Sequence, residues 1–148
     1  MALALSLGGT APAWAGTQLF DTKNTSMGIN SNSQLIQGIS ERNSTNTQAI
    51  PFTAQVYSTG GECVRLQVTS SGAIDEEIVF VSPTGDVWRD DDGGPGNFPL
   101  VKANTDVDGW YTVHVNDFAG GGGAAIFTLR YGRYNSGNPN CSSPTPVL

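Results

Sequence analysis

Short runs of β-branched and aromatic residues, separated by turn-forming residues, most constrain how this chain can fold. Residues 78–81 (IVFV) are such a run, which is long enough for a buried strand and too short for a helix. Residues 82–85 (SPTG) read as a turn, because Pro fixes φ and Gly tolerates positive φ. Residues 86–88 then return as a second strand. No long apolar stretch in the 148 residues has helical periodicity, so the sequence predicts an all-β protein.

Alternation of apolar and polar residues predicts most of the other strands. It is clearest in residues 110–116, where Tyr111, Val113 and Val115 share one face. Weaker alternation marks further strands at residues 34–39, 50–57, 63–69 and 126–134. About seven or eight short strands separated by turns predict an antiparallel β-sandwich.

The two ends of the chain differ from this patterned centre. Residues 1–15 are apolar and end in an Ala-x-Ala motif, which predicts a secretory signal peptide, although no basic residue precedes the apolar run. An ordinary N-terminal strand is the alternative. Residues 16–47 form a polar arm, residues 48–134 the sandwich, and residues 135–148 a polar tail. We therefore expect a secreted or periplasmic protein with no membrane-inserted segment.

Cys63 and Cys141 are the two cysteines of the chain. An even number in an exported protein favours a disulfide over two free thiols. The apolar residues of the strand at 63–69 alternate with Cys63, so this cysteine should lie on the outer face of its sheet. A disulfide would then hold the tail across the outside of the sheet, as the tail's one anchor.

Several segments of the chain together resemble the bacterial pre-peptidase C-terminal (PPC) domain. In order, they are Asp75 before a strand, the turn at 83–85, the loop at 90–94 (DDDGG), the strand at 109–115 (GWYTVHV) and the strand at 127–129 (FTL). The resemblance covers residues 50–134 and implies a secreted β-sandwich of jelly-roll type. Members of this family accompany secreted hydrolases, and several bind calcium or insoluble polymers. No peptidase domain lies in the present sequence.

Acidic residues gather between positions 75 and 92 and suggest a cation site. Neighbouring carboxylates repel one another unless a cation or hydrogen bonds hold them, and Ca²⁺ prefers several oxygen ligands. The candidate calcium ligands are Asp75, Glu77, Asp90, Asp91 and Asp92. The alternative is a turn in which the Asp side chains accept hydrogen bonds from backbone N–H groups.

No catalytic constellation is recognisable in the sequence. His114 is the one histidine, and its neighbours on the same strand face are polar, which predicts an outward position on a surface strand. A G-x-S-x-G nucleophile motif and a phosphate-binding loop are both absent from the sequence. The acidic residues lie mostly in turns rather than in pairs. The sequence therefore predicts a protein that is not an enzyme.

Trp88 and Trp110 are candidate outward aromatic residues that could stack on sugars, or that could instead cover sheet edges. The net charge of −6 and the scattered basic residues argue against nucleic-acid and anionic-membrane partners. We expect an exported, non-catalytic binding or adhesion module with a polymer or protein partner and structural calcium. The alternative is a structural or assembly protein of the cell envelope or extracellular matrix, whose arm pairs with a neighbour's sheet edge.

Overall fold

The computed structural model describes residues 17–20, 34–42, 52–71, 75–118 and 124–148. The signal peptide predicted at residues 1–15 lies outside the described residues. A 3₁₀ helix, η1 (Pro139–Cys141), is the one helix in the described part of the chain. None of the described residues form a helix with the length and hydropathy that a membrane span requires.

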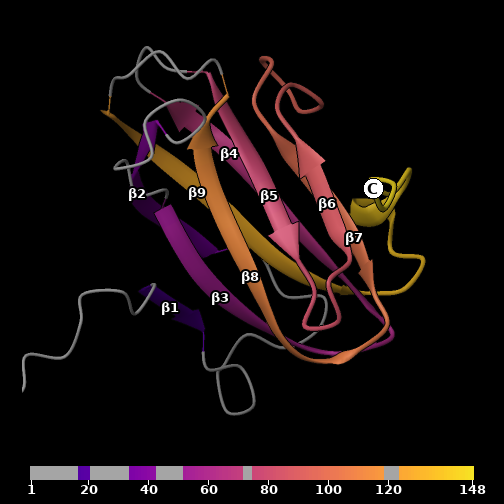
Figure 1. Ribbon diagram of the computed structural model, residues 1–148. Helices are drawn as coiled ribbons and strands as arrows, with labels where there is room; N and C mark the ends of the chain where they lie inside the picture. Colours follow the sequence, from indigo (N-terminus) through magenta and orange to yellow (C-terminus); the bar gives the residue numbers. More distant parts are fainter. Residues whose placement is uncertain (1–16, 21–33, 43–51, 72–74, 119–123) are drawn as a thin grey trace, which may run out of the picture.

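Nine strands in the described residues form two sheets that face each other (Figure 1). One sheet has the order β1 (Thr17–Phe20), β3 (Phe52–Thr59), β8 (Asp108–Asp117), β5 (Glu76–Val81) and β6 (Val87–Asp90). The other has the order β2 (Gln34–Arg42), β9 (Ala124–Asn135), β4 (Glu62–Ser71) and β7 (Leu100–Thr105). The β-sandwich that the sequence predicts is confirmed.

Strand β2 joins the two sheets. It pairs antiparallel with β9 over residues 34–41, and Glu41 and Arg42 then pair parallel with Asn116 and Asp117 of β8. This edge of β8 is available because β3 pairs with β8 only as far as Val115. Strands β1 and β2 both come from the predicted polar arm, so the arm contributes strands to the sandwich.

The core lies between the two sheets and is built from the inward residues of each alternating strand. Tyr111, Val113 and Val115 of β8, which the sequence places on one face, are fully buried. Other buried residues of the same cluster are Ala54, Val56, Val64, Leu66, Val68, Ile78, Phe80, Trp88, Val101, Ala103, Phe127, Leu129 and Tyr131. Burial of such apolar area is the main free energy that holds the two sheets together.

Tyr111 also fixes the turn between β7 and β8. Its phenol donates a hydrogen bond to the Val107 carbonyl at 3.0 Å. The Val107 N–H in turn donates to the Tyr111 phenol oxygen at 3.3 Å. Burial raises the pKa of this phenol. A buried tyrosine that bonds to backbone a few residues upstream is a recurrent device of β-sandwiches.

The C-terminal tail is held by a disulfide between Cys63 and Cys141, as the sequence predicts. Cys63 packs with Tyr134 and Cys141 in a cluster separate from the core, so it lies on the outer face of its sheet. The expectation that Cys141 is the tail's one anchor is wrong. The Thr145 and Leu148 N–H groups donate hydrogen bonds to the carbonyls of Lys102 in β7 and Val87 in β6, at 3.0 and 2.9 Å.

Candidate functional site

Of the predicted calcium ligands, Asp90 is the last residue of β6, and Asp91 and Asp92 begin the connection from β6 to β7. The Asp90 carboxylate accepts hydrogen bonds from the backbone N–H of Gly93 at 2.9 Å and of Leu100 at 2.7 Å. A Cβ at Gly93 would come within 2.6 Å of this carboxylate, so a larger residue there would have to displace the Asp90 side chain. Asp90 therefore closes its loop as an acceptor for backbone N–H groups, which is the alternative that the sequence left open.

Glu77 is buried on β5 and does not join the other acidic residues. Arg89 donates from Nε to its Oε2, and the Asn116 side-chain amide donates to its Oε1 at 3.4 Å. In the described part of the chain, no three His, Cys, Asp or Glu side chains are placed to hold a metal ion. The five predicted calcium ligands are therefore not gathered in one group there, and Asp90 and Glu77 accept hydrogen bonds within the fold. Calcium binding itself stays a prediction.

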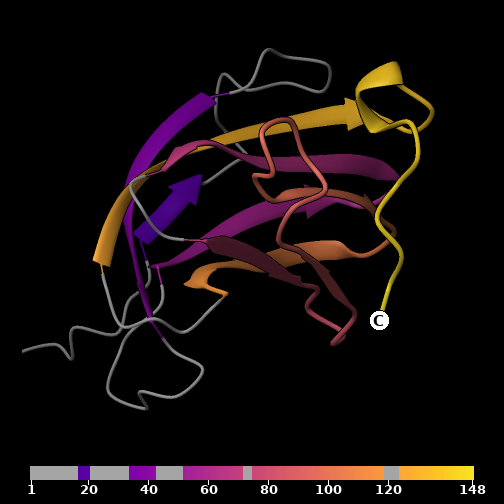
Figure 2. The same cartoon turned by 90° about the horizontal axis from the view of Figure 1, so that it is seen from above.

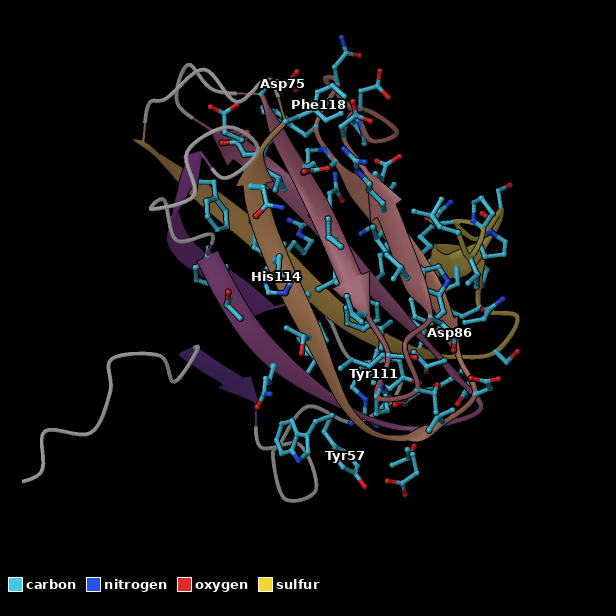
Figure 3. The ribbon with its side chains drawn as sticks, viewed as in Figure 1. Tyr57, Asp75, Asp86, Tyr111, His114 and Phe118 are labelled. Carbon is cyan, nitrogen blue, oxygen red and sulfur yellow. A yellow bond between two sulfur atoms is a disulfide. The ribbon has the colours of Figure 1, made fainter. Side chains whose placement is uncertain are left out.

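Asp75, another of the predicted ligands, lies beside an exposed aromatic residue. Asp75 and Phe118 come together because the Phe118 N–H donates to the Asp75 carbonyl at 2.7 Å (Figure 3). The Phe118 side chain is 42% exposed, and the Arg89 guanidinium lies 5.5 Å from the centre of its ring. Partial burial, followed by the charge of Asp92, raises the pKa of Asp91. We call Asp75, Asp91, Asp92 and Phe118 the acidic end.

The prediction that Trp88 points outward is wrong. Its side chain is 2% exposed and lies in the core, with ring centres 5.6 Å from Phe80 and 6.2 Å from Tyr111. The reason is the pairing of β5 with β6, which places Trp88 opposite the inward residue Phe80. A residue without an exposed ring face cannot stack on a sugar.

Trp110 is half-buried on β8, and its binding role stays a prediction. Its ring packs edge-to-face against Tyr57 of β3, with centres 5.3 Å apart. The Tyr57 phenol donates a hydrogen bond to the exposed Asp108 carboxylate. We call Tyr57, Asp108 and Trp110 the aromatic end, which lies opposite the acidic end (Figure 3).

His114 lies between the two ends on β8, opposite Thr53 of β3. The imidazole Nδ1 is 3.0 Å from the Thr53 hydroxyl, and burial lowers its pKa. At neutral pH the ring is therefore neutral. The half-buried ring has the outward direction that the sequence predicts, and the partner shown here is a hydroxyl on the neighbouring strand.

A buried ion pair between Glu62 and Arg133 is not predicted from the sequence. The guanidinium donates to both Glu62 oxygens at 2.8 to 3.1 Å, and the two residues are 1% and 5% exposed. The Ser58 hydroxyl and the Thr59 N–H donate to the same carboxylate at 2.7 and 3.0 Å. The two residues lie far apart in the sequence, and the pairing of β4 with β9 brings them together. The contacts satisfy the carboxylate inside the fold, so the pair is structural.

Comparisons with known proteins show the fold. No protein family and no curated protein match this sequence. Among solved structures, the chain resembles PliG of Aeromonas hydrophila, a periplasmic lysozyme inhibitor of g-type lysozyme. The TM-score is 0.51 at 13% identity, and the match covers 70% of this chain and 88% of that chain. At this identity the likeness establishes a shared β-sandwich fold and nothing about activity. The resemblance to the PPC domain stays a prediction.

Proposed function

We propose that this chain is an exported, non-catalytic module that binds a protein. The observation that carries the proposal is the fold likeness to PliG, a periplasmic protein that inhibits g-type lysozyme. A sandwich of this kind can bind through loops and strand faces without contributing to catalysis. A g-type lysozyme is therefore the first partner to test.

The contacts of the polar side chains support a non-catalytic role. His114 faces a threonine hydroxyl, Glu62 is held by Arg133, and Glu77 is held by Arg89. A nucleophile needs a base within hydrogen-bond distance and a third group to orient that base. The contacts of these residues give no such arrangement and instead link strands to one another.

The surface charge supports a partner with a basic surface. The chain carries a net charge of −6, and the acidic end includes the exposed residues Asp75, Asp92 and Phe118. Opposite charges across an interface raise the association rate, and an exposed aromatic ring adds apolar contact area. Trp110 and Asp108 offer a second contact surface at the aromatic end.

A lysis assay and a calorimetric titration with a purified g-type lysozyme test this proposal. We expect the chain to bind at one-to-one stoichiometry and to slow the lysis of bacterial cell walls. Pelleting with insoluble polysaccharides is the parallel test for a polymer partner. Pelleting with a polysaccharide but no heat with lysozyme would replace the protein-binding proposal with the polymer-binding one.

Single substitutions locate the contact. Phe118→Ala should weaken lysozyme binding by about tenfold or more if the acidic end is the contact surface, as expected for a central aromatic residue. Trp110→Ala tests the aromatic end in the same way. Val147→Ala is the matched control, because Val147 is 52% exposed on the tail and belongs to neither end. If Phe118→Ala and Trp110→Ala both bind lysozyme as tightly as the unmodified chain, neither the acidic end nor the aromatic end is the contact surface.

The alternative role in envelope assembly rested on pairing of the arm with a neighbour. Strands β1 and β2 of the arm instead pair with β3, β8 and β9 of their own chain. These two strands are therefore already engaged within the sandwich, and they give arm exchange no support.

A further inference from the structure

One side of the sandwich is formed by the outermost strands of its two sheets. In the described part of the chain, the one strand that β6 pairs with is β5, and the one that β7 pairs with is β4. Strands β6 and β7 lie next to each other on this side (Figure 1). An uncovered strand edge presents N–H and C=O groups that can pair with another chain.

The edge of β7 is already occupied by hydrogen-bond partners that are not strands. The Lys102 N–H donates to the Thr145 hydroxyl at 3.0 Å, and the Lys102 carbonyl accepts from the Thr145 N–H at 3.0 Å. Two positions earlier on the same edge, the Leu100 N–H donates to the Asp90 carboxylate at 2.7 Å. The backbone groups of alternate residues along a strand face the same edge. Thr145 and Asp90 therefore occupy consecutive pairing positions of β7.

The tail continues from β7 to β6 and crosses both layers of the sandwich (Figure 2). The Leu148 N–H donates to the Val87 carbonyl of β6 at 2.9 Å, and the Lys102 ammonium donates to the Ser142 carbonyl. Val147 and Leu148 are 52% and 78% exposed, so the tail buries little of its apolar surface. Its contacts with the sandwich are mainly hydrogen bonds to strand edges.

Two prolines keep the tail from becoming a new edge. Pro144 and Pro146 flank Thr145, and proline has no N–H to offer a further strand. The disulfide at Cys141 anchors the start of this segment to β4. The tail thus supplies hydrogen-bond partners to the backbone groups of the β7 edge. It does not present a new edge with which a further strand could pair.

We propose that residues 142–148 form an edge cover that prevents the β7 edge from pairing with a second copy of this chain. Without the cover, Lys102 exposes both backbone groups. The β7 strands of two copies can then pair antiparallel about a two-fold axis, an arrangement in which each copy contributes the same surface.

Deletion of residues 143–148 tests the proposal while leaving Cys141 and its disulfide in place. We expect the shortened chain to elute with a mass near twice that of the monomer by light scattering, at concentrations where the full chain is less associated. Adding Lys102→Pro to the shortened chain should restore the monomer, because proline removes the N–H that faces the edge. A cooperative thermal melt verifies that each variant is folded.

A folded shortened chain that associates no more than the full chain would overturn the proposal. Association that persists with Lys102→Pro would also overturn it, since the contact would then lie elsewhere. If the shortened chain does not fold, Thr145→Pro in the full chain removes both bonds to Lys102 with the tail retained. This variant should self-associate, and a folded Thr145→Pro monomer rejects the edge cover.

Discussion

Burial decides how much each ion pair of this protein contributes to stability. Glu62 and Arg133 are both nearly inaccessible, and hydrogen bonds from Ser58 and Thr59 complete the shell around the carboxylate. The pair between Glu77 and Arg89 is different, because 47% of the Arg89 side chain is exposed. Water and ions screen the second pair, whereas removing one member of the first leaves a buried charge without its partner.

Arg133→Met should therefore lower the free energy of unfolding by about 3–5 kcal/mol, as for other broken buried pairs. Arg89→Met is the matched control and should change it by about 1 kcal/mol or less. Urea denaturation measures both. Equal effects of the two substitutions would contradict the distinction based on burial.

His114 offers a direct test of the local environment because it is the only histidine of the chain. Burial lowers its pKa below the ordinary value of 6.5. At pH values between the lowered pKa of the folded chain and 6.5, the unfolded chain binds more protons than the folded one. The contribution of His114 to stability is therefore complete above pH 6.5 and is lost as the pH falls through this window.

A nuclear magnetic resonance titration of the single imidazole measures this pKa. We expect a value below 6.5. His114→Gln should also remove part of the loss of stability on acidification through the same window. A measured pKa at or above the ordinary value would show that the imidazole is more hydrated, or closer to an acid, than its contact with Thr53 indicates.

At the scale of the elements, alternation predicts the inward residues wherever a strand is long. Strand β8 shows this, since the three residues predicted to share a face are all buried. Strand β6 has four residues, which is too few for alternation to set a direction, and the orientation of Trp88 was predicted wrongly. Its direction is set by the register with β5, a long-range property that the local sequence does not contain.

The loop from β6 to β7 shows the same limit for the candidate site. The run of acids and glycines is visible in the sequence, but the use of the Asp90 carboxylate depends on Leu100, ten positions later. Glu77 depends likewise on Arg89, across a strand pair. These carboxylates therefore bind partners that only the fold brings to them.

A chelator experiment tests the calcium prediction. Bound calcium requires EDTA to lower the melting temperature, whereas the hydrogen bonds of Asp90 and Glu77 alone predict no change. Asp90→Ala should lower the melting temperature by the same amount with and without EDTA, because it removes two loop hydrogen bonds. A lower melting temperature of the unmodified chain in EDTA would establish a bound cation and support the calcium prediction.

At the scale of the whole molecule, two segments from the ends of the chain complete the sandwich. Strand β2 links the sheets through Asn116 and Asp117 of β8, and the tail crosses the opposite side at Lys102 and Val87. The sequence predicted a β-sandwich and the disulfide from strand spacing and cysteine number. It did not predict these contacts, because they join residues far apart in the chain through backbone groups that nearly every residue type carries.

The proposal of a protein-binding role belongs to this largest scale, because it rests on the likeness of the whole fold to PliG. Isothermal titration of this chain into a purified g-type lysozyme tests it most directly. We predict saturable binding at one-to-one stoichiometry, with slower lysis of cell walls at the same ratio. An absence of binding heat at several temperatures, together with unchanged lysis, would contradict the proposal.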